Sequence, residues 1–217
     1  MMWKFSLRTV MVLLCCVAAP AYANLIDNGT FAAGLSGWNY SGDVRVGIAS
    51  SDTPGMDGAY ALLGADPARN GSSSLSQKFS ILGLSEIEVS FDWFFRYTDR
   101  APLASDTFAA LLWESGVGLP PVITYEMLEA KSVDYTVDRR GIVSGHFHDI
   151  YDLGTWFPLV GGITFTLLES PSIGTLISSA GVDNVSVAVP VPEPSALVVM
   201  GSVILGLSVR RWVHRKG

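Results

Sequence analysis

The longest patterned stretch of the chain spans residues 86–99, where apolar side chains alternate with others. One parity is apolar throughout and holds Ile87, Val89, Phe91, Trp93, Phe95 and Tyr97. The other parity holds Glu86, Glu88, Ser90, Asp92, Phe94 and Arg96. A period of two is typical of a β-strand with one face in the core and one face outward. We therefore predict a strand here, with Phe94 and Arg96 on its outward face.

Further strands are predicted elsewhere in the chain. The same alternation recurs at 163–167 and 185–189, and shorter candidates occupy 60–63 and 75–81. The run 108–113 is continuously apolar, which is typical of a central strand that is covered on both faces. The only helical turn that we expect lies near 125–131.

Turn signals separate these stretches, among them Asn28-Gly29, Asp57-Gly58 and Asn70-Gly71. Frequent turns between short alternating segments predict an all-β domain. Antiparallel sheets with one apolar face bury it best against a second sheet. We therefore predict a β-sandwich ectodomain over residues 24–189.

Residues 1–23 have the pattern of a secretory signal peptide. Basic residues precede an apolar run, and the run is followed by Ala21-Tyr22-Ala23, the small-x-small sequence that signal peptidase cleaves. We predict cleavage between Ala23 and Asn24. Both cysteines of the chain lie before this bond, so we expect a mature protein without disulfides.

Residues 190–217 have a second three-part pattern. The motif Val191-Pro192-Glu193-Pro194 precedes residues 195–209, which contain no charge. This apolar run is about 22 Å long as a helix, which can cross a thinned bilayer when terminal arginines snorkel. The chain then ends with a basic cluster, Arg210, Arg211, Arg215 and Lys216. Because basic residues stay on the cytoplasmic side, we predict a transmembrane helix that leaves 24–189 outside.

The Pro-Glu-Pro motif, the short apolar helix and the arginine-rich end resemble the PEP-CTERM sorting signal of Gram-negative bacteria. The resemblance implies a membrane processing enzyme of the exosortase type that cuts near the motif. It also implies transfer of the ectodomain from the inner membrane to the cell surface or the extracellular matrix. If the tail stays uncut, the protein is a single-pass inner-membrane protein that faces the periplasm.

Composition restricts the partners of the ectodomain. Hydrophobic residues make up 49% and charged residues 16% of the chain, which favours a folded domain over disorder. The formal net charge is −6, but residues 24–190 carry 8 basic and 19 acidic residues, a formal charge of −11. An acidic domain lacks the basic surface that nucleic acids require, so we exclude a nucleic-acid partner.

Three segments of the ectodomain resemble jelly-roll domains of the galactose-binding and carbohydrate-binding-module type. The opening 24–31, followed by 34–38 with Trp38, is similar to the first strand and turn of these domains. The segment 181–187 resembles their final strand, and 57–62 resembles an internal one. The resemblance implies a jelly-roll-like fold and an extracellular polysaccharide as a ligand.

The same resemblance implies a structural calcium ion near the first and last strands. Asp183 matches the late ligand position. Family members often have acidic residues near the opening where this chain has Thr30 and Ala32. Calcium prefers oxygen ligands, so Asp183 is our candidate ligand, with capping of a strand end as its alternative role.

Sugar binding in such modules uses aromatic faces that stack on pyranose rings. We interpret Trp38 and Trp93 as structural residues. Tyr40 is another available aromatic residue. The residues that we select as candidate ligand contacts are Phe94, Arg96, Trp113 and Trp156.

A cluster of His146, His148, Asp149 and Asp152 is the best candidate for catalysis. In an extended strand the two histidines point the same way, which suits a transition metal. The chain has no nucleophile elbow, zinc-protease helix motif or phosphate loop. We therefore predict a protein that is not an enzyme, and keep a small metal-dependent hydrolase as an alternative.

Together these patterns predict an exported protein of the cell surface or extracellular matrix. We expect a structural or adhesive role in the exopolysaccharide matrix. A carbohydrate-binding module with a defined glycan site is the main alternative.

Overall fold

The computed structural model describes residues 23–64, 71–97, 106–116, 123–132, 141–153, 160–169 and 178–189. The predicted sorting signal, Trp156 and all but Ala23 of the predicted signal peptide lie outside these ranges. Within the described ranges no helix is long and apolar enough to span a bilayer. By its internal contacts, Asn24–Val189 forms one compact unit.

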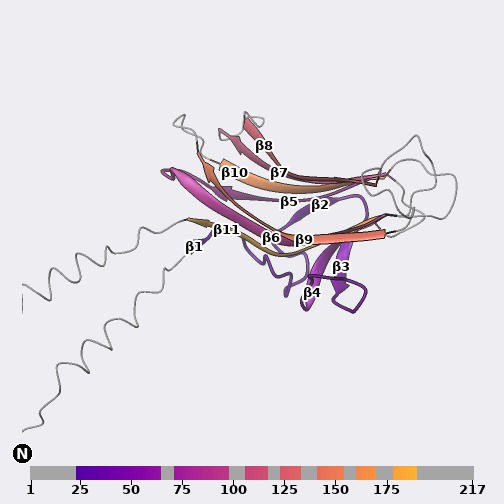
Figure 1. Ribbon diagram of the computed structural model, residues 1–217. Coiled ribbons are helices and arrows are strands. Elements are labelled where there is room, and N and C mark those ends of the chain that lie inside the picture. Colours follow the sequence, from indigo (N-terminus) through magenta and orange to yellow (C-terminus); the bar gives the residue numbers. More distant parts are fainter. Residues whose placement is uncertain are drawn as a thin grey trace, which may run out of the picture. The chain divides into compact units, whose positions relative to one another are not determined.

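The described residues form two antiparallel sheets that stack face to face (Figure 1). The six-stranded sheet has the order β3 (Val44–Ile48), β4 (Ala59–Gly64), β11 (Ser179–Val189), β6 (Glu86–Tyr97) and β9 (Gly141–Asp152), with β1 (Ala23–Asn24) paired to β11. The five-stranded sheet has the order β2 (Asn39–Ser41), β5 (Ser72–Ser80), β10 (Val160–Leu168), β7 (Thr107–Ser115) and β8 (Ile123–Lys131). The predicted all-β sandwich is confirmed.

Aromatic rings join the two sheets across the core. Phe91 of β6 meets Phe165 of β10 edge to face, with ring centroids 5.0 Å apart. Trp93 of β6 stacks near Phe108 of β7 at 6.2 Å, and only 9% of its surface is exposed. Burial of a large apolar side chain is worth about 1.5–3 kcal/mol. These contacts confirm the apolar parity of β6 and the structural role predicted for Trp93.

The opening loop is organised by Asn28. Its side chain donates to the carbonyl oxygens of Gly34 and Ser36 and accepts from the Ala33 amide, at 2.9–3.0 Å. Its own carbonyl oxygen accepts from Trp38 Nε1 at 3.2 Å. Trp38 is buried, so its predicted structural role is confirmed.

The helical turn predicted near 125–131 is wrong, because this segment is strand β8. Leu111 pairs with Glu126 but Ala110 pairs with Leu128, so Met127 is an extra residue in a β-bulge. A bulge breaks the period of two. Tyr125 and Leu128 therefore face the same side at a spacing of three, which resembles a helical period.

The prediction that 108–113 is covered on both faces is also wrong. In β7 the residues Phe108, Ala110 and Leu112 are buried, whereas the residues between them are only partly covered. The apolar residues of the second parity belong to the outer surface of the sandwich. Among them is Trp113.

Candidate functional site

The outer face of the five-stranded sheet is rich in small hydroxyl side chains, and we call it the hydroxyl face. It includes the outward positions Ser72, Ser74, Ser76, Lys78 and Ser80 on β5, Gly162, Thr164, Thr166 and Leu168 on β10, Thr107, Ala109, Leu111 and Trp113 on β7, and Thr124, Glu126, Glu129 and Lys131 on β8. On the adjoining β2 strand the Ser41 hydroxyl lies 2.9 Å from the Ser74 hydroxyl. Because most of these side chains are short, the indole of Trp113 projects beyond its neighbours on this face.

Trp113 lies in a row that crosses the sheet. Gly162 is registered with Lys78 on one side and with Trp113 on the other. A β-carbon placed on Gly162 would lie 2.1 Å from Cζ2 of the indole, so the ring covers the glycine. The ammonium of Lys78 lies 5.8 Å from the ring centroid. The missing side chain at Gly162 thus lets the indole lie across the sheet toward Lys78.

The orientation of the indole is fixed by a hydrogen bond. Trp113 Nε1 donates to Thr164 Oγ1 at 3.1 Å. Trp113 is partly exposed. An aromatic surface beside hydroxyl groups is the chemistry that binds a sugar ring, because the ring has apolar C–H faces and polar edges.

The expectation that Phe94 is exposed is wrong. Its side chain is 1% exposed, although it stands on the outward parity of β6. The Tyr60 ring meets it edge to face at 5.7 Å. A β-carbon on Gly181 would lie 2.1 Å from Phe94 Cε1, so the ring lies over that glycine. Phe94 is therefore a packing residue of the outer surface and is not available to a ligand.

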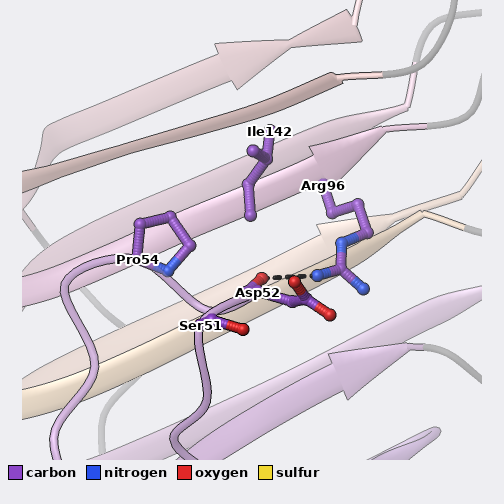
Figure 2. Close-up of a pocket in the computed structure, with 5 residues that line it drawn as sticks. All are labelled: Ser51, Asp52, Pro54, Arg96 and Ile142. Atoms are coloured by element: carbon purple, nitrogen blue, oxygen red, sulfur yellow. Dashed lines mark hydrogen bonds between the residues drawn. The ribbon is translucent and has the colours of Figure 1, made fainter.

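Arg96, two residues further along β6, lies at a pocket of about 440 Å³ (Figure 2). The pocket is lined by Ser51, Asp52, Pro54, Arg96 and Ile142. Arg96 Nη2 donates to the backbone carbonyl oxygen of Asp52 at 2.6 Å. Arg96 and Ile142 are registered partners on β6 and β9, so the sheet itself places them together.

The two histidines of β9 share the outer face, as the spacing predicted, but each contacts a different carboxylate. His146 Nδ1 lies 2.7 Å from Asp92 Oδ1, and His148 Nε2 lies 2.9 Å from Glu88 Oε1. In the part of the chain that the structure describes, no group of three or more His, Cys, Asp or Glu side chains could hold a metal ion. The geometry therefore gives two separate cross-strand pairs.

Asp183 of β11 is fully buried and ties a loop to the sheet. Oδ2 accepts from the Asp57 amide at 3.0 Å and Oδ1 accepts from the Asn184 amide at 2.7 Å. Burial raises the pKa of this carboxyl, and the two amides partly offset the rise. Both oxygens accept backbone amides, as in the capping role that was the alternative for Asp183. The calcium ion stays an expectation from the resemblance.

Three carboxylates that the sequence analysis missed gather near the start of β11. The Ser178 hydroxyl donates to Asp106 Oδ2 at 2.5 Å. Burial, followed by the charges of Asp106 and Asp43, raises the pKa of Glu169 to about 7. Asp43 Oδ2 and Glu169 Oε2 are buried, and among the described residues neither atom has a hydrogen-bond partner. Only the folded chain brings these distant positions together, so no local pattern could identify them.

Comparison with known proteins identifies the C-terminal signal. The family model of the PEP-CTERM protein-sorting motif matches residues 190–211. The chain therefore carries this sorting motif, and the prediction made from Val191-Pro192-Glu193-Pro194 is confirmed. No curated protein matches the sequence.

Solved structures match the sandwich at low sequence identity. The enzymatically active domain of tailspike protein 4 from bacteriophage CBA120 has a TM-score of 0.52 and 12% identity, over 76% of this chain and 21% of that chain. The chain thus spans about a fifth of the tailspike protein that it matches. TmCBM61 in complex with β-1,4-galactotriose has a TM-score of 0.47 and 17% identity, over 76% and 97% of the two chains. The xylan-binding domain from CBM 22 has a TM-score of 0.45 and 13% identity, over 77% and 96%.

These likenesses concern the fold. The matched structures include several carbohydrate-binding modules, the tailspike domain and a Stig cyclase.

Proposed function

We propose that the mature protein is an exported glycan-binding protein that holds a polysaccharide chain against the hydroxyl face. The observation that carries the proposal is the position of Trp113, which lies across Gly162 and donates to Thr164. In this proposal the protein has an adhesive or structural role in the extracellular matrix, and it catalyses no reaction.

The indole supplies the main contact with the sugar. A pyranose ring that stacks on it buries C–H groups against an aromatic surface, a contact that is worth about 25 cal/mol per Å² of apolar area. Because the hydrogen bond to Thr164 already fixes the indole, little side-chain entropy is lost on binding. Stacking against a rigid ring therefore supports binding without a deep cavity.

The surrounding hydroxyl groups supply the polar contacts. The serines of β5 and the threonines of β10 alternate along neighbouring strands, so donors and acceptors repeat across the sheet. A neutral polysaccharide presents hydroxyl groups in the same repeating way. Hydroxyl side chains both donate and accept, which suits a ligand made of hydroxyl groups.

Delivery to the surface rests on the two ends of the chain. The sorting motif supports export and an exosortase-type partner. In the proposal, the signal peptide 1–23 is removed first and the helix 195–209 holds the chain in the inner membrane until processing. The Leu25 amide donates to the Val187 carbonyl oxygen at 2.7 Å, so the beginning and the end of the sandwich lie on adjacent strands.

Glycan binding is tested with the mature, secreted protein. Pull-down with insoluble polysaccharides and a glycan array identify a ligand, and titration calorimetry then compares the wild type with Trp113→Ala and Trp113→Phe. We expect at least a tenfold loss for Trp113→Ala and a smaller loss for Trp113→Phe. Ile48→Ala is the control, since Ile48 is 72% exposed on the other sheet. Equal binding by Trp113→Ala and the wild type would overturn the proposal.

A further inference from the structure

The pocket beside Arg96 is built from three segments on the outer face of the six-stranded sheet. Arg96 comes from β6, Ile142 from β9, and Ser51, Asp52 and Pro54 from the connection between β3 and β4 (Figure 2). The connection is closed by the Ala49 amide, which donates to the Gly58 carbonyl oxygen at 2.7 Å. A sheet floor and a closed loop make this a preformed site.

Arg96 brings a positive charge to the pocket, and Asp52 brings a negative one. One of its five N–H donors is used by the carbonyl oxygen of Asp52. That bond orients the guanidinium without neutralising it, because a carbonyl carries no net charge. Among the described residues no ion pair involves Arg96. The remaining donors form the planar fork that binds a carboxylate through two parallel hydrogen bonds.

A second arginine lies on the same outer face. Arg45 of β3 is registered with Leu62 of β4, which shares the outward parity of Tyr60 on that strand. Burial raises the pKa of Tyr60, and the charges of Arg96 and Arg45 oppose that rise. Two arginines on one face are distinctive, because residues 24–190 carry a formal charge of −11.

The other walls of the pocket fit a sugar ring. Pro54 and Ile142 are apolar, and Ile142 is 43% exposed. A ligand that covers Ile142 removes apolar surface from water. The Ser51 hydroxyl adds a donor and acceptor, and a volume of about 440 Å³ is sufficient for one monosaccharide unit.

We propose that this pocket is a second glycan site, which binds a carboxylate-bearing sugar unit of the uronic acid type through Arg96. The carboxylate meets the guanidinium, and the C–H face of the ring meets Pro54 and Ile142. Asp52 is exposed and lines the same pocket. Its negative charge opposes an anionic ligand and limits the affinity.

The position of the pocket gives it a role in the matrix. The two sheets pack face to face, so the pocket and the hydroxyl face point away from each other. Arg96 is registered with Ser179, ten residues before Val189 on β11, which places the pocket about 33 Å from the end of that strand. If the proposed function of the hydroxyl face also holds, one domain binds two chains and cross-links an acidic polysaccharide to a neutral one.

The test is titration calorimetry of the mature protein with glucuronate and galacturonate oligosaccharides. The neutral reference ligands are the same oligosaccharides with each carboxylate reduced to a primary alcohol. Because the hydroxyl face is itself proposed to bind neutral sugars, we expect the acidic forms to bind more tightly than the reduced forms, and the difference in affinity to fall as salt is raised. Arg96→Gln is expected to lower the affinity at least tenfold, and Arg96→Lys to retain part of it. Asp52→Asn, which leaves the backbone bond to Arg96 in place, is expected to raise it about two- to fivefold.

Two results would overturn the proposal. One is equal binding of the acidic and the reduced ligands, and the other is unchanged acidic binding by Arg96→Gln. Arg96 also holds the loop through Asp52, so Arg96→Gln could misfold. Asp52→Asn is then the second test of the site. An unchanged or lower affinity of Asp52→Asn for acidic sugars counts against the site. Ile150→Ala, exposed on β9 outside the pocket, is the matched control and is expected to leave acidic binding unchanged. Binding of the reduced ligands reports on the hydroxyl face, and the additional affinity for the acidic ligands reports on the pocket, so their failures are separate outcomes.

Discussion

The indole of Trp113 lies across the backbone of Gly162 on the neighbouring strand, at a position where any side chain would collide with the ring. A β-carbon there would lie 2.1 Å from Cζ2. Gly162 does not have the left-handed backbone conformation that favours glycine. A glycine is needed at this position because the Trp113 ring leaves no room for a side chain.

Gly162→Ala is therefore expected to displace the indole from the sheet. We expect a loss of about 1–3 kcal/mol of stability from the forced overlap, and a loss of glycan affinity similar to that of Trp113→Ala. Denaturant unfolding and calorimetry measure the two effects. Ile150→Ala, exposed on the outer face of the other sheet, is the control. Full glycan affinity in Gly162→Ala would contradict the importance that we give to the ring position.

Phe94→Ala is expected to destabilise the domain although the sequence places Phe94 on the outward parity. The side chain is fully enclosed by Tyr60, Gly181 and their neighbours, so its removal leaves a cavity. We expect a loss of about 3–5 kcal/mol in the free energy of unfolding. The exposed Ile48 is the control, because Ile48→Ala should change stability by less than about 0.5 kcal/mol. A similarly small change for Phe94→Ala would show that the ring is not packed as described.

The stability of the domain is expected to fall as the pH rises toward neutrality because of Glu169. Its pKa is raised from 4.5 to about 7 in the folded state by burial and by Asp106 and Asp43. The folded state then binds more protons than the unfolded state between these values. The stabilising contribution is complete below pH 4.5 and is lost as the pH rises through 7. Since the group is partly solvated, the effect is on the order of 1–2 kcal/mol.

Glu169→Gln separates this contribution from those of other carboxyls. The variant is expected to be more stable than the wild type at pH 8, and to show a flatter dependence of the unfolding free energy between pH 5 and 8. Glu114 and Asp183 also have a raised pKa, so part of the pH dependence should remain. Glu86→Gln is a control on exposed surface. A wild type whose stability rises from pH 5 to pH 8 would contradict the prediction.

Alternation allowed the strands and the apolar core to be predicted from the sequence, because a period of two depends only on neighbouring residues. It assigned Trp93 to the core correctly and failed for Phe94. Parity gives the side of the sheet on which a residue lies, but it does not show what covers that side. The cover of Phe94 comes from Tyr60, which is distant in the sequence and lies on another strand.

The sequence was sufficient to select residues of the candidate sites, but it did not show which other residues lie beside them. Trp113 and Arg96 were selected from the sequence as an aromatic ring and an exposed charge. The row of Lys78, Gly162 and Trp113 depends on the register of three strands, and the pocket depends on how one loop folds over the sheet. The bulge at Met127 similarly imitated a helical period. Such long-range relationships leave no local pattern.

The processing of both ends is expected to leave the sandwich intact. Strand β11 ends at Val189, directly before the sorting motif, and Asn24 Oδ1 accepts from the Val187 amide at 3.1 Å. Cleavage after Ala23 and near Pro192 thus removes no residue from the hydrogen bonds that pair Asn24 and Leu25 with Val187. Intact-mass analysis of the product from a host with an exosortase-type enzyme should show a chain from Asn24 to about Pro192, at the surface or in the medium.

Variants of the motif test whether Glu193 and Pro194 are required for this cleavage. Glu193→Gln and Pro194→Ala are expected to retain the C-terminal tail and to remain with the inner membrane, whereas Val189→Ala, just before the matched residues 190–211, is the control. The end of β11 at Val189 also predicts that removal of the tail leaves stability nearly unchanged, since the described sheet contacts of this strand stop before the tail. If the wild-type chain keeps its tail in such a host, the predicted cleavage near Pro192 does not occur. The sandwich would then act on the periplasmic side of the membrane.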